Sequence, residues 1–312
     1  MADPRPLPFA PGDRPTLLCV GHQIDVLYAR VPEPMGERSG DHPLGARDAA
    51  ALPRGRSLIV RTGISPVLPV AGEWFDLTVE RAWRFGGTDY LAGTVERTWL
   101  DLGAVELPPL RLGHQVPWTL EAWLQQHDLE LGDLAPAYDE VIASPHRREV
   151  EMEQVLPEPF TPLELEEDPI VEAAAWREAG DSARCEKLLS EMLRQDLRCV
   201  DAHAHLGNLF MQGYWGFPDA ARAQRHYRVG VEIAEKALAP DGQDVTPKGF
   251  LDNRPYLRAL HGFGLATWAL GDAAEAEQSF AQLLWRDPAD GAGARFLIQA
   301  VRDGIDYEDY AG

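Results

Sequence analysis

Residues 261–288, HGFGLATWALGDAAEAEQSFAQLLWRDP, constrain the fold more than any other stretch of the chain. A Gly-Asp pair at 271–272 separates two apolar runs; Ala276 follows the Gly by five residues, Phe280 comes four later and Pro288 eight later still. The Gly-Asp pair suits the end of one helix and the cap of the next, and the Pro suits the end of the second. The stretch therefore predicts two antiparallel helices joined by a tight turn.

The same offsets recur twice upstream. If the small residue of the second helix is the marker, the three copies are marked by Cys185, Ala223 and Ala276, which lie 38 and 53 residues apart. The unequal steps fit a unit of about 34 residues with short insertions, WGFP at 215–218 and a Pro-, Gly- and Asp-rich span at 239–256. We therefore expect a repeated helical hairpin.

The spacing of small and large residues gives a packing rule for these hairpins. Two helices approach closely where a small residue on each faces the other, which predicts that Gly207 and Gly264 on first helices face Ala223 and Ala276 on second ones. Tyr227 and Phe280, one turn beyond the small residue of each second helix, are then expected to fill the gap to the next hairpin.

On these residues the chain resembles the tetratricopeptide-repeat family from about residue 169 to residue 304. The resemblance implies three helix-turn-helix units, with residues 293–304 forming a closing helix. Proteins of this family use the concave face, lined by the first helix of each unit, to hold a peptide or a partner's helix.

Mapping the family's positions onto this chain places a set of mixed polar and apolar side chains near that groove. They are Arg177, Asp201, His205, Asn208, Met211, Arg258, His261 and Trp268. Some family members grip a terminal carboxylate with a Lys/Asn/Arg set, but here only Asn208 falls on a matching position, so such a clamp is not expected. For Trp268 and Met211 alone, the residue type favours core packing over a role as a binding hot spot.

The N-terminal half has the period of β-strands. Between residues 16 and 112 short aliphatic runs are bounded by Gly and Pro, and two long alternating segments flank a GGT turn at 86–88. Residues 118–131 read as a helix with Thr119 as its N-cap. We expect residues 16–148 to form a small, mostly antiparallel β-barrel or roll after a flexible start at 1–15, and thus an α+β protein.

Three segments read as connections. The span from Pro32 to Pro53 is rich in Gly, Pro and charge and predicts a mobile loop. Residues 149–168 are acidic and Pro-rich and predict an extended linker, or alternatively a docking strip for a basic partner. The acidic tail at 305–312 predicts a solvated end, or a peptide that docks on another subunit.

Composition excludes several classes of protein. A formal net charge of −21 argues against a nucleic-acid partner, and the chain has no long apolar run of the kind that crosses a membrane. The three cysteines are widely spaced, and no secretory signal is evident, which indicates a cytoplasmic protein. Arginine far outnumbers lysine, a bias typical of high-GC, bacterial coding sequences.

Catalytic and metal-binding patterns are weak. His203 and His205 are two residues apart and diverge on a helix, so they do not predict a metal site. Cys19 with His22 and Asp25 could imitate a nucleophile pair, but no oxyanion-hole motif accompanies them, and a buried strand cysteine is the alternative. We expect no catalytic residue, metal or cofactor.

The sequence thus predicts a non-enzymatic adaptor or accessory subunit that binds a partner protein or peptide in a helical groove. The alternative makes the N-terminal β domain a small-ligand-binding or catalytic module, which would require His22, Asp25, His42 and Arg61 to converge. In a third possibility the repeats serve homo-oligomeric self-association.

Overall fold

The computed structural model describes the chain except for residues 1–5, 24–25, 33–54, 64–66, 159, 161–167, 214–216 and 312. The described residues divide into two compact units, one made of residues 1–108 and 156–198 and the other of residues 109–155 and 199–312. The predicted Pro32–Pro53 loop lies outside the described residues, as does most of the stretch from 159 to 167.

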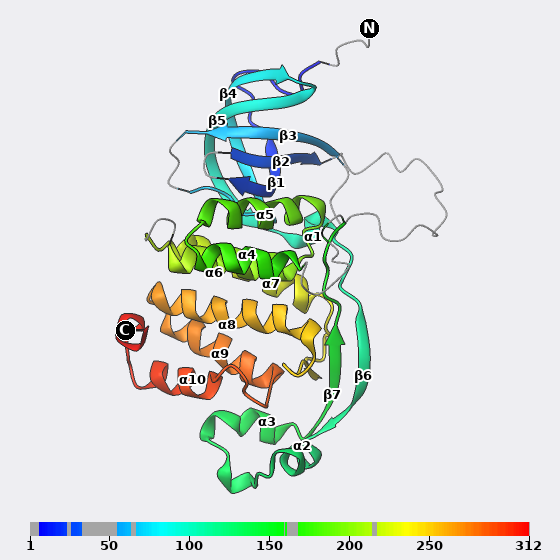
Figure 1. Ribbon diagram of the computed structural model, residues 1–312, viewed down its shortest axis with the longest axis vertical. Coiled ribbons are helices and arrows are strands. Elements are labelled where there is room, and N and C mark those ends of the chain that lie inside the picture. The colour runs from blue at the N-terminus through cyan, green and yellow to red at the C-terminus, as the bar shows by residue number, and fades with distance from the viewer. Residues whose placement is uncertain are drawn as a thin grey trace, which may run out of the picture. The chain divides into compact units, whose positions relative to one another are not determined.

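The first unit is built on a closed barrel of five strands. These are β1 (Thr16–Gln23), β2 (Val26–Pro32), β3 (Gly55–Thr62), β4 (Glu73–Phe85) and β5 (Thr88–Leu100). They follow each other around the barrel as β1-β2-β3-β5-β4, with β3 and β5 parallel and the other described pairs antiparallel (Figure 1). The predicted β-barrel, and with it the α+β class, is confirmed.

Alternation along the strands fills the barrel interior with aliphatic side chains. Leu17, Leu27, Val60, Phe75 and Leu77 are nearly fully buried in this core. The predicted β4–β5 hairpin turns at Gly86 and Gly87, whose φ angles of 58° and 83° are those of a tight two-residue turn and favour glycine.

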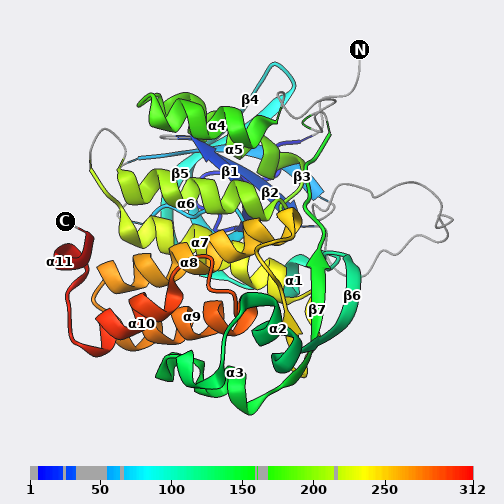
Figure 2. The same ribbon diagram turned by 60° about the horizontal axis from the view of Figure 1, so that its bottom comes forward.

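The described residues of the first unit also form three helices. They are the short α1 (Leu102–Val105), α4 (Pro169–Glu178) and α5 (Ser182–Gln195). Helix α5 packs against β1, as Figure 2 shows. A Cβ at Gly21 of β1 would lie 2.9 Å from Cγ of Arg194, so the glycine permits this close approach. The first predicted repeat therefore belongs to the same compact unit as the barrel.

The second unit is a stack of helices. It contains α6 (Val200–Gln212), α7 (Ala220–Glu235), α8 (Arg254–Ala269), α9 (Ala273–Arg286), α10 (Ala294–Arg302) and α11 (Tyr307–Ala311). Helix α8 contacts α6, α7 and α9, and α9 contacts α10. Helices α7 and α9 begin at Asp219 and Asp272, each of which accepts a backbone N–H in its helix's first turn. Helix α5 of the first unit begins in the same way at Asp181.

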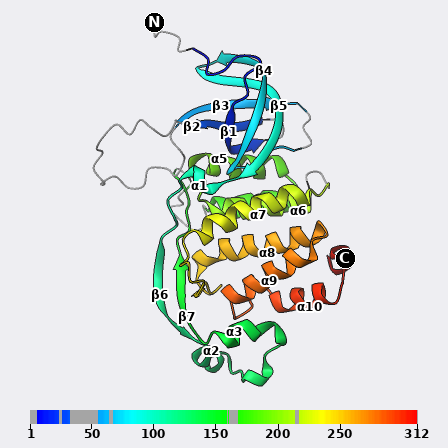
Figure 3. The ribbon, with the colours of Figure 1, turned by 180° about the vertical axis from the view of Figure 1, so that it is seen from behind.

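A β-arm precedes this stack in sequence. It consists of β6 (Leu112–Thr119), α2 (Leu120–His127), α3 (Asp139–Ala143) and β7 (His146–Met152), with single turns at Leu131–Asp133 and Pro136–Tyr138. Thr119 caps α2 as expected, through the N–H of Ala122. The β6–β7 ribbon runs along one side of α8 and α9 (Figure 3).

Two of the expected segment boundaries differ from those in the structure. Residues 109–148, expected in the β domain, belong to the compact unit of α6–α11, and the expected linker begins inside strand β7. Residues 239–256, expected as a loop, contain β8 (Asp244–Val245), which extends β7 in parallel, and a turn at Leu251–Asn253. Long-range strand pairing, which local periodicity does not record, produces both differences.

Asn253 explains how this inserted segment is held. Its Oδ1 accepts the N–H of Met152 at 2.8 Å, and its Nδ2 donates to the carbonyls of Val150 and Pro247 at 2.9 and 3.1 Å. The side chain is fully buried, so β7 and the start of α8 are fastened by one satisfied amide.

Candidate functional site

Tyr227 fills the space to the next hairpin as predicted, whereas the atoms nearest Gly207 and Gly264 belong to aromatic rings rather than to the expected small residues Ala223 and Ala276. A Cβ at Gly207 of α6 would lie 2.4 Å from the ring of Tyr227, and one at Gly262 of α8 would lie 2.2 Å from it. Tyr227 of α7 therefore occupies the space between two successive first helices. Phe280 of α9 lies against Gly264 of its own hairpin, 2.4 Å from the position that a Cβ there would take.

Asp201 is the centre of the polar cluster on these first helices. Its carboxylate forms an ion pair with Arg258 of α8 and lies 3.6 Å from Nε2 of His205, one turn along α6. Gln154, just beyond β7, donates to its second oxygen at 3.4 Å. Asp201 and His205 are buried, whereas the Arg258 side chain is 34% exposed. The structure thus brings together three of the predicted residues.

The other predicted residues have different surroundings. Asn208 accepts a hydrogen bond from the Tyr227 hydroxyl at 2.7 Å and so helps to position that ring. Met211 and His261 are half-buried. Burial, with the charge of Lys248 as a second cause, lowers the pKa of His261 below its ordinary value, so this ring is neutral near pH 7.

Trp268 and Arg177 do not join this cluster. Trp268 is 4% exposed; its Nε1 donates to the carbonyl of Ile305, and the rings of Tyr307 and Tyr310 pack on it at 6.0 and 5.1 Å between centroids. The tail that was expected to be solvated therefore covers it with helix α11. Arg177 lies on α4, in the other compact unit.

The residues that a catalytic alternative requires do not converge among those the structure describes. His22 of β1 pairs with Glu186 of α5, Nδ1 to Oε1 at 2.8 Å, and both are buried. The thiol of Cys19 donates to the carbonyl of Gly21 at 3.4 Å. Arg61 is exposed, and Asp25 and His42 lie outside the described residues.

A metal site is likewise not assembled in the described part of the chain. His203 lies on α6 with its ring 6.0 Å from that of His226 on α7. Among the described residues, no group of three or more His, Cys, Asp or Glu side chains has the geometry to hold a metal ion. No described helix is both long enough and apolar enough to cross a bilayer.

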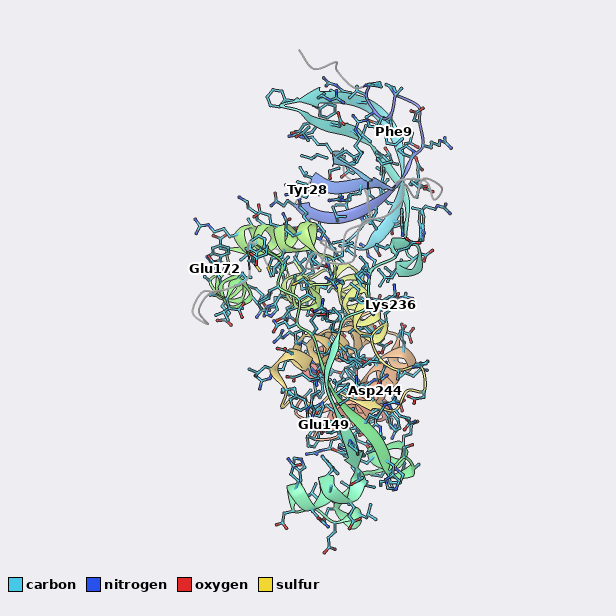
Figure 4. All side chains as sticks on the ribbon, turned by 90° about the vertical axis from the view of Figure 1, so that its right-hand side faces the viewer. Phe9, Tyr28, Glu149, Glu172, Lys236 and Asp244 are labelled. Atoms are coloured by element: carbon cyan, nitrogen blue, oxygen red, sulfur yellow. The ribbon has the colours of Figure 1, made fainter. Side chains whose placement is uncertain are left out.

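The barrel carries a cleft that the sequence did not indicate. It has a volume of about 430 Å³ and is lined by Tyr28 and Arg30 of β2, Ser57 of β3, Thr88 after the hairpin turn and Arg194 of α5, among others. The guanidinium of Arg194 lies 3.8 Å over the ring of Tyr28, which Figure 4 labels. None of the described lining residues is acidic, although the whole chain has a net charge of −21.

Alternation along β2 and β3 explains this lining. Leu27, Ala29 and Leu58 belong to the barrel core, so their neighbours Tyr28, Arg30 and Ser57 face outward. Burial lowers the pKa of the Arg30 guanidinium, which stays charged near neutral pH. The period-2 pattern could have identified the outward residues, but the partner arginine comes from α5, 164 residues after Arg30 in the chain.

Comparison with known proteins adds no assignment: no protein-family model matches this chain, and a search of curated proteins found no relative.

Proposed function

We propose that this protein is a non-enzymatic interaction subunit whose stacked helical hairpins bind a segment of a partner protein. The supporting observation is the ion pair between Asp201 of α6 and Arg258 of α8. It joins two first helices that also contact each other, and the face they share carries the Arg258 side chain, which is 34% exposed, over the buried Asp201 and His205. The resemblance to tetratricopeptide repeats assigns partner binding to that face.

Packing supports the same proposal. Tyr227 fixes the spacing of α6 and α8 by filling the space at both Gly207 and Gly262. A rigid spacing between the two helices limits the ordering cost when a partner binds across them. Half-buried Met211 and His261 add an adaptable apolar group and a neutral ring to the face.

The test uses the full chain as bait in its own cell extract. The variant Met211→Ala/His261→Ala alters the face without touching the Asp201 ion pair or the Tyr227 hydrogen bond. The control Arg228→Ala changes an exposed residue of α7 that pairs only locally with Glu232. We expect the face variant to lose a specific partner by about tenfold, a cost of about 1.4 kcal/mol, while the control retains it.

Unfolding midpoints of the baits must agree before the captures are compared. If the wild type and the face variant capture the same proteins in the same amounts, the face of α6 and α8 is not the binding surface and the proposal is wrong.

A second candidate function follows from the barrel cleft, which suits a small anion. Five-stranded barrels of the OB type use the face of strands 2 and 3 and the loop between strands 4 and 5 as their ligand site. This cleft lies at those elements, with two arginines for charge and the Ser57 and Thr88 hydroxyls as donors.

The second candidate is tested by titrating the full chain with inorganic phosphate and with citrate in a calorimeter. We expect Arg194→Gln to weaken binding by about tenfold, because one of two guanidinium contacts is lost. The matched control is Arg184→Gln, on the same helix, where the side chain is 68% exposed and pairs with Asp181. Equal affinities of the two variants would exclude the cleft.

A further inference from the structure

A small pocket in the second unit is lined by aromatic and acidic side chains, whereas the cleft on the barrel is lined by arginines. It has a volume of about 200 Å³ and lies where β6 enters α2, beside β7 and the turns that follow β8 and α9. Its lining includes Trp118, Trp123, Pro247 and Pro288, with the carboxylates of Glu149 and Asp287.

Two tryptophans form the aromatic part of the wall. The rings of Trp118 and Trp123 lie 6.4 Å apart between centroids and are inclined at 41°, and both residues are 6% exposed. Thr119 between them caps α2 and so fixes the angle at which Trp123 leaves the strand. Tyr138 packs on Trp123 at 6.0 Å. The ring positions are therefore set by the fold.

The same aromatic cluster already holds one cation. The guanidinium of Arg147, on β7, lies 5.6 Å from the Trp118 ring centroid and 3.6 Å from that of Trp285. Both distances are within the range of about 6 Å from a ring centroid at which an indole attracts a cation. Arg147 itself is buried and is not among the residues that line the pocket.

The charges that line the pocket are negative. Glu149 lies on β7 beside Asp244 on β8 (Figure 4), and its Oε1 is 3.8 Å from Nε2 of His114. Asp287 is 2% exposed and accepts the backbone N–H groups of Lys248 and Gly291 at 3.3 and 3.2 Å. The described lining contains neither lysine nor arginine; His127 is its one basic side chain.

We propose that this pocket binds an organic ammonium group, the end of a small quaternary amine or of a lysine side chain. Indole rings and carboxylates in one wall attract a cation and repel an anion. The volume admits such a group but not a large ligand. This site lies on the β6–α2 arm, apart from the α6 and α8 residues of the proposed function, and is independent of it.

The test compares choline with 3,3-dimethylbutan-1-ol, which has the same shape without the charge. Calorimetry and the indole N–H signals of the full chain report binding. We expect saturable binding of choline at about millimolar concentration and binding of the neutral alcohol that is weaker by about tenfold. Signals of Trp118 and Trp123 should shift with choline.

Two variants and a control locate the site. Glu149→Gln and Trp123→Phe should each weaken choline binding by about fivefold or more. Glu121→Gln removes the same charge from an exposed position on α2 and should leave binding unchanged. Thermal melts confirm folding, and Glu149→Gln remains decisive if Trp123→Phe is destabilised.

A third arm distinguishes the source of the ammonium group. Tighter binding of an N-acetyl-lysine amide, plain or trimethylated, than of choline assigns the pocket to a partner's side chain; the reverse assigns it to a free amine. Equal binding of choline and the neutral alcohol, equal effects of Glu149→Gln and Glu121→Gln, or no shift of either indole signal up to about 50 mM ligand would overturn the proposal.

Discussion

The ring of Tyr227 lies so close to Gly262 that a Cβ at residue 262 would fall 2.2 Å from its Cε1 atom. The contact joins the second helix of one hairpin to the first helix of the next, and the hydroxyl of the same ring is tied back to Asn208. The spacing of α6 and α8 is therefore set by a glycine facing a tyrosine.

Gly262→Ala should destabilise the protein by about 1–2 kcal/mol. Overpacking costs about 1–3 kcal/mol, and the better helix propensity of alanine recovers up to about 1 kcal/mol. Gly230→Ala on α7 is the matched control, because a Cβ there would lie 3.3 Å from Cβ of His203, a much less severe contact than 2.2 Å. Urea unfolding measures both. If Gly262→Ala is as stable as the control, this contact does not set the packing.

Glu186→Ala should cost about 3–5 kcal/mol, since it removes one partner of a buried pair and leaves the His22 imidazole without that carboxylate. Glu172→Ala on the exposed side of α4 should change the free energy of unfolding by less than about 0.5 kcal/mol. Similar losses for the two variants would show that the pair between β1 and α5 contributes little.

Stability should fall as pH rises through the titration of Asp287. Burial raises the pKa of this carboxyl above its ordinary value, so the folded state holds the proton more tightly than the unfolded state does. The free energy that the tighter proton binding adds to the stability of the folded state is fully present below the unfolded pKa of about 3.9. It is lost as pH rises through the folded pKa.

Asp287→Asn should therefore gain in stability relative to the wild type as pH rises above the unfolded pKa of about 3.9. The gain is partial, because burial also raises the pKa of Asp290, which the variant retains. Urea unfolding at a series of pH values gives the two curves. Parallel curves would mean that Asp287 titrates alike in both states.

Cys185 should resist alkylation in the folded protein. Burial raises the pKa of its thiol to about 11, so almost no thiolate exists at pH 8. Cys19 and Cys199 are buried as well. Mass spectrometry after iodoacetamide treatment should find the native chain unmodified and the denatured chain with three adducts. An adduct on the native chain at Cys185 would contradict this account.

The candidate binding residues could be predicted from the sequence only in part. The repeat offsets identified the first-helix residues, and Asp201, His205 and Arg258 do lie together. The offsets could not show that Trp268 is covered by the Tyr307–Ala311 helix, because that depends on where the chain turns after α10.

The sequence by itself determined the local structure. Gly86 and Gly87 form a hairpin turn, and Thr119 begins a helix. The spacing from Gly207 to Tyr227 marks a close pair of helices. Each feature depends on residues that are near one another in the chain or on a repeated period. These features follow from backbone conformation, capping and side-chain volume.

Only the tertiary structure decided which segments associate. The β6–β7 arm belongs with the later helices, while α5 joins the barrel through His22 and Glu186. The inserted residues Asp244 and Val245 form a strand only because β7 offers an open edge. Such pairings depend on hydrogen bonds and buried surfaces between residues that are distant in the chain. Local patterns in a single sequence therefore do not show them.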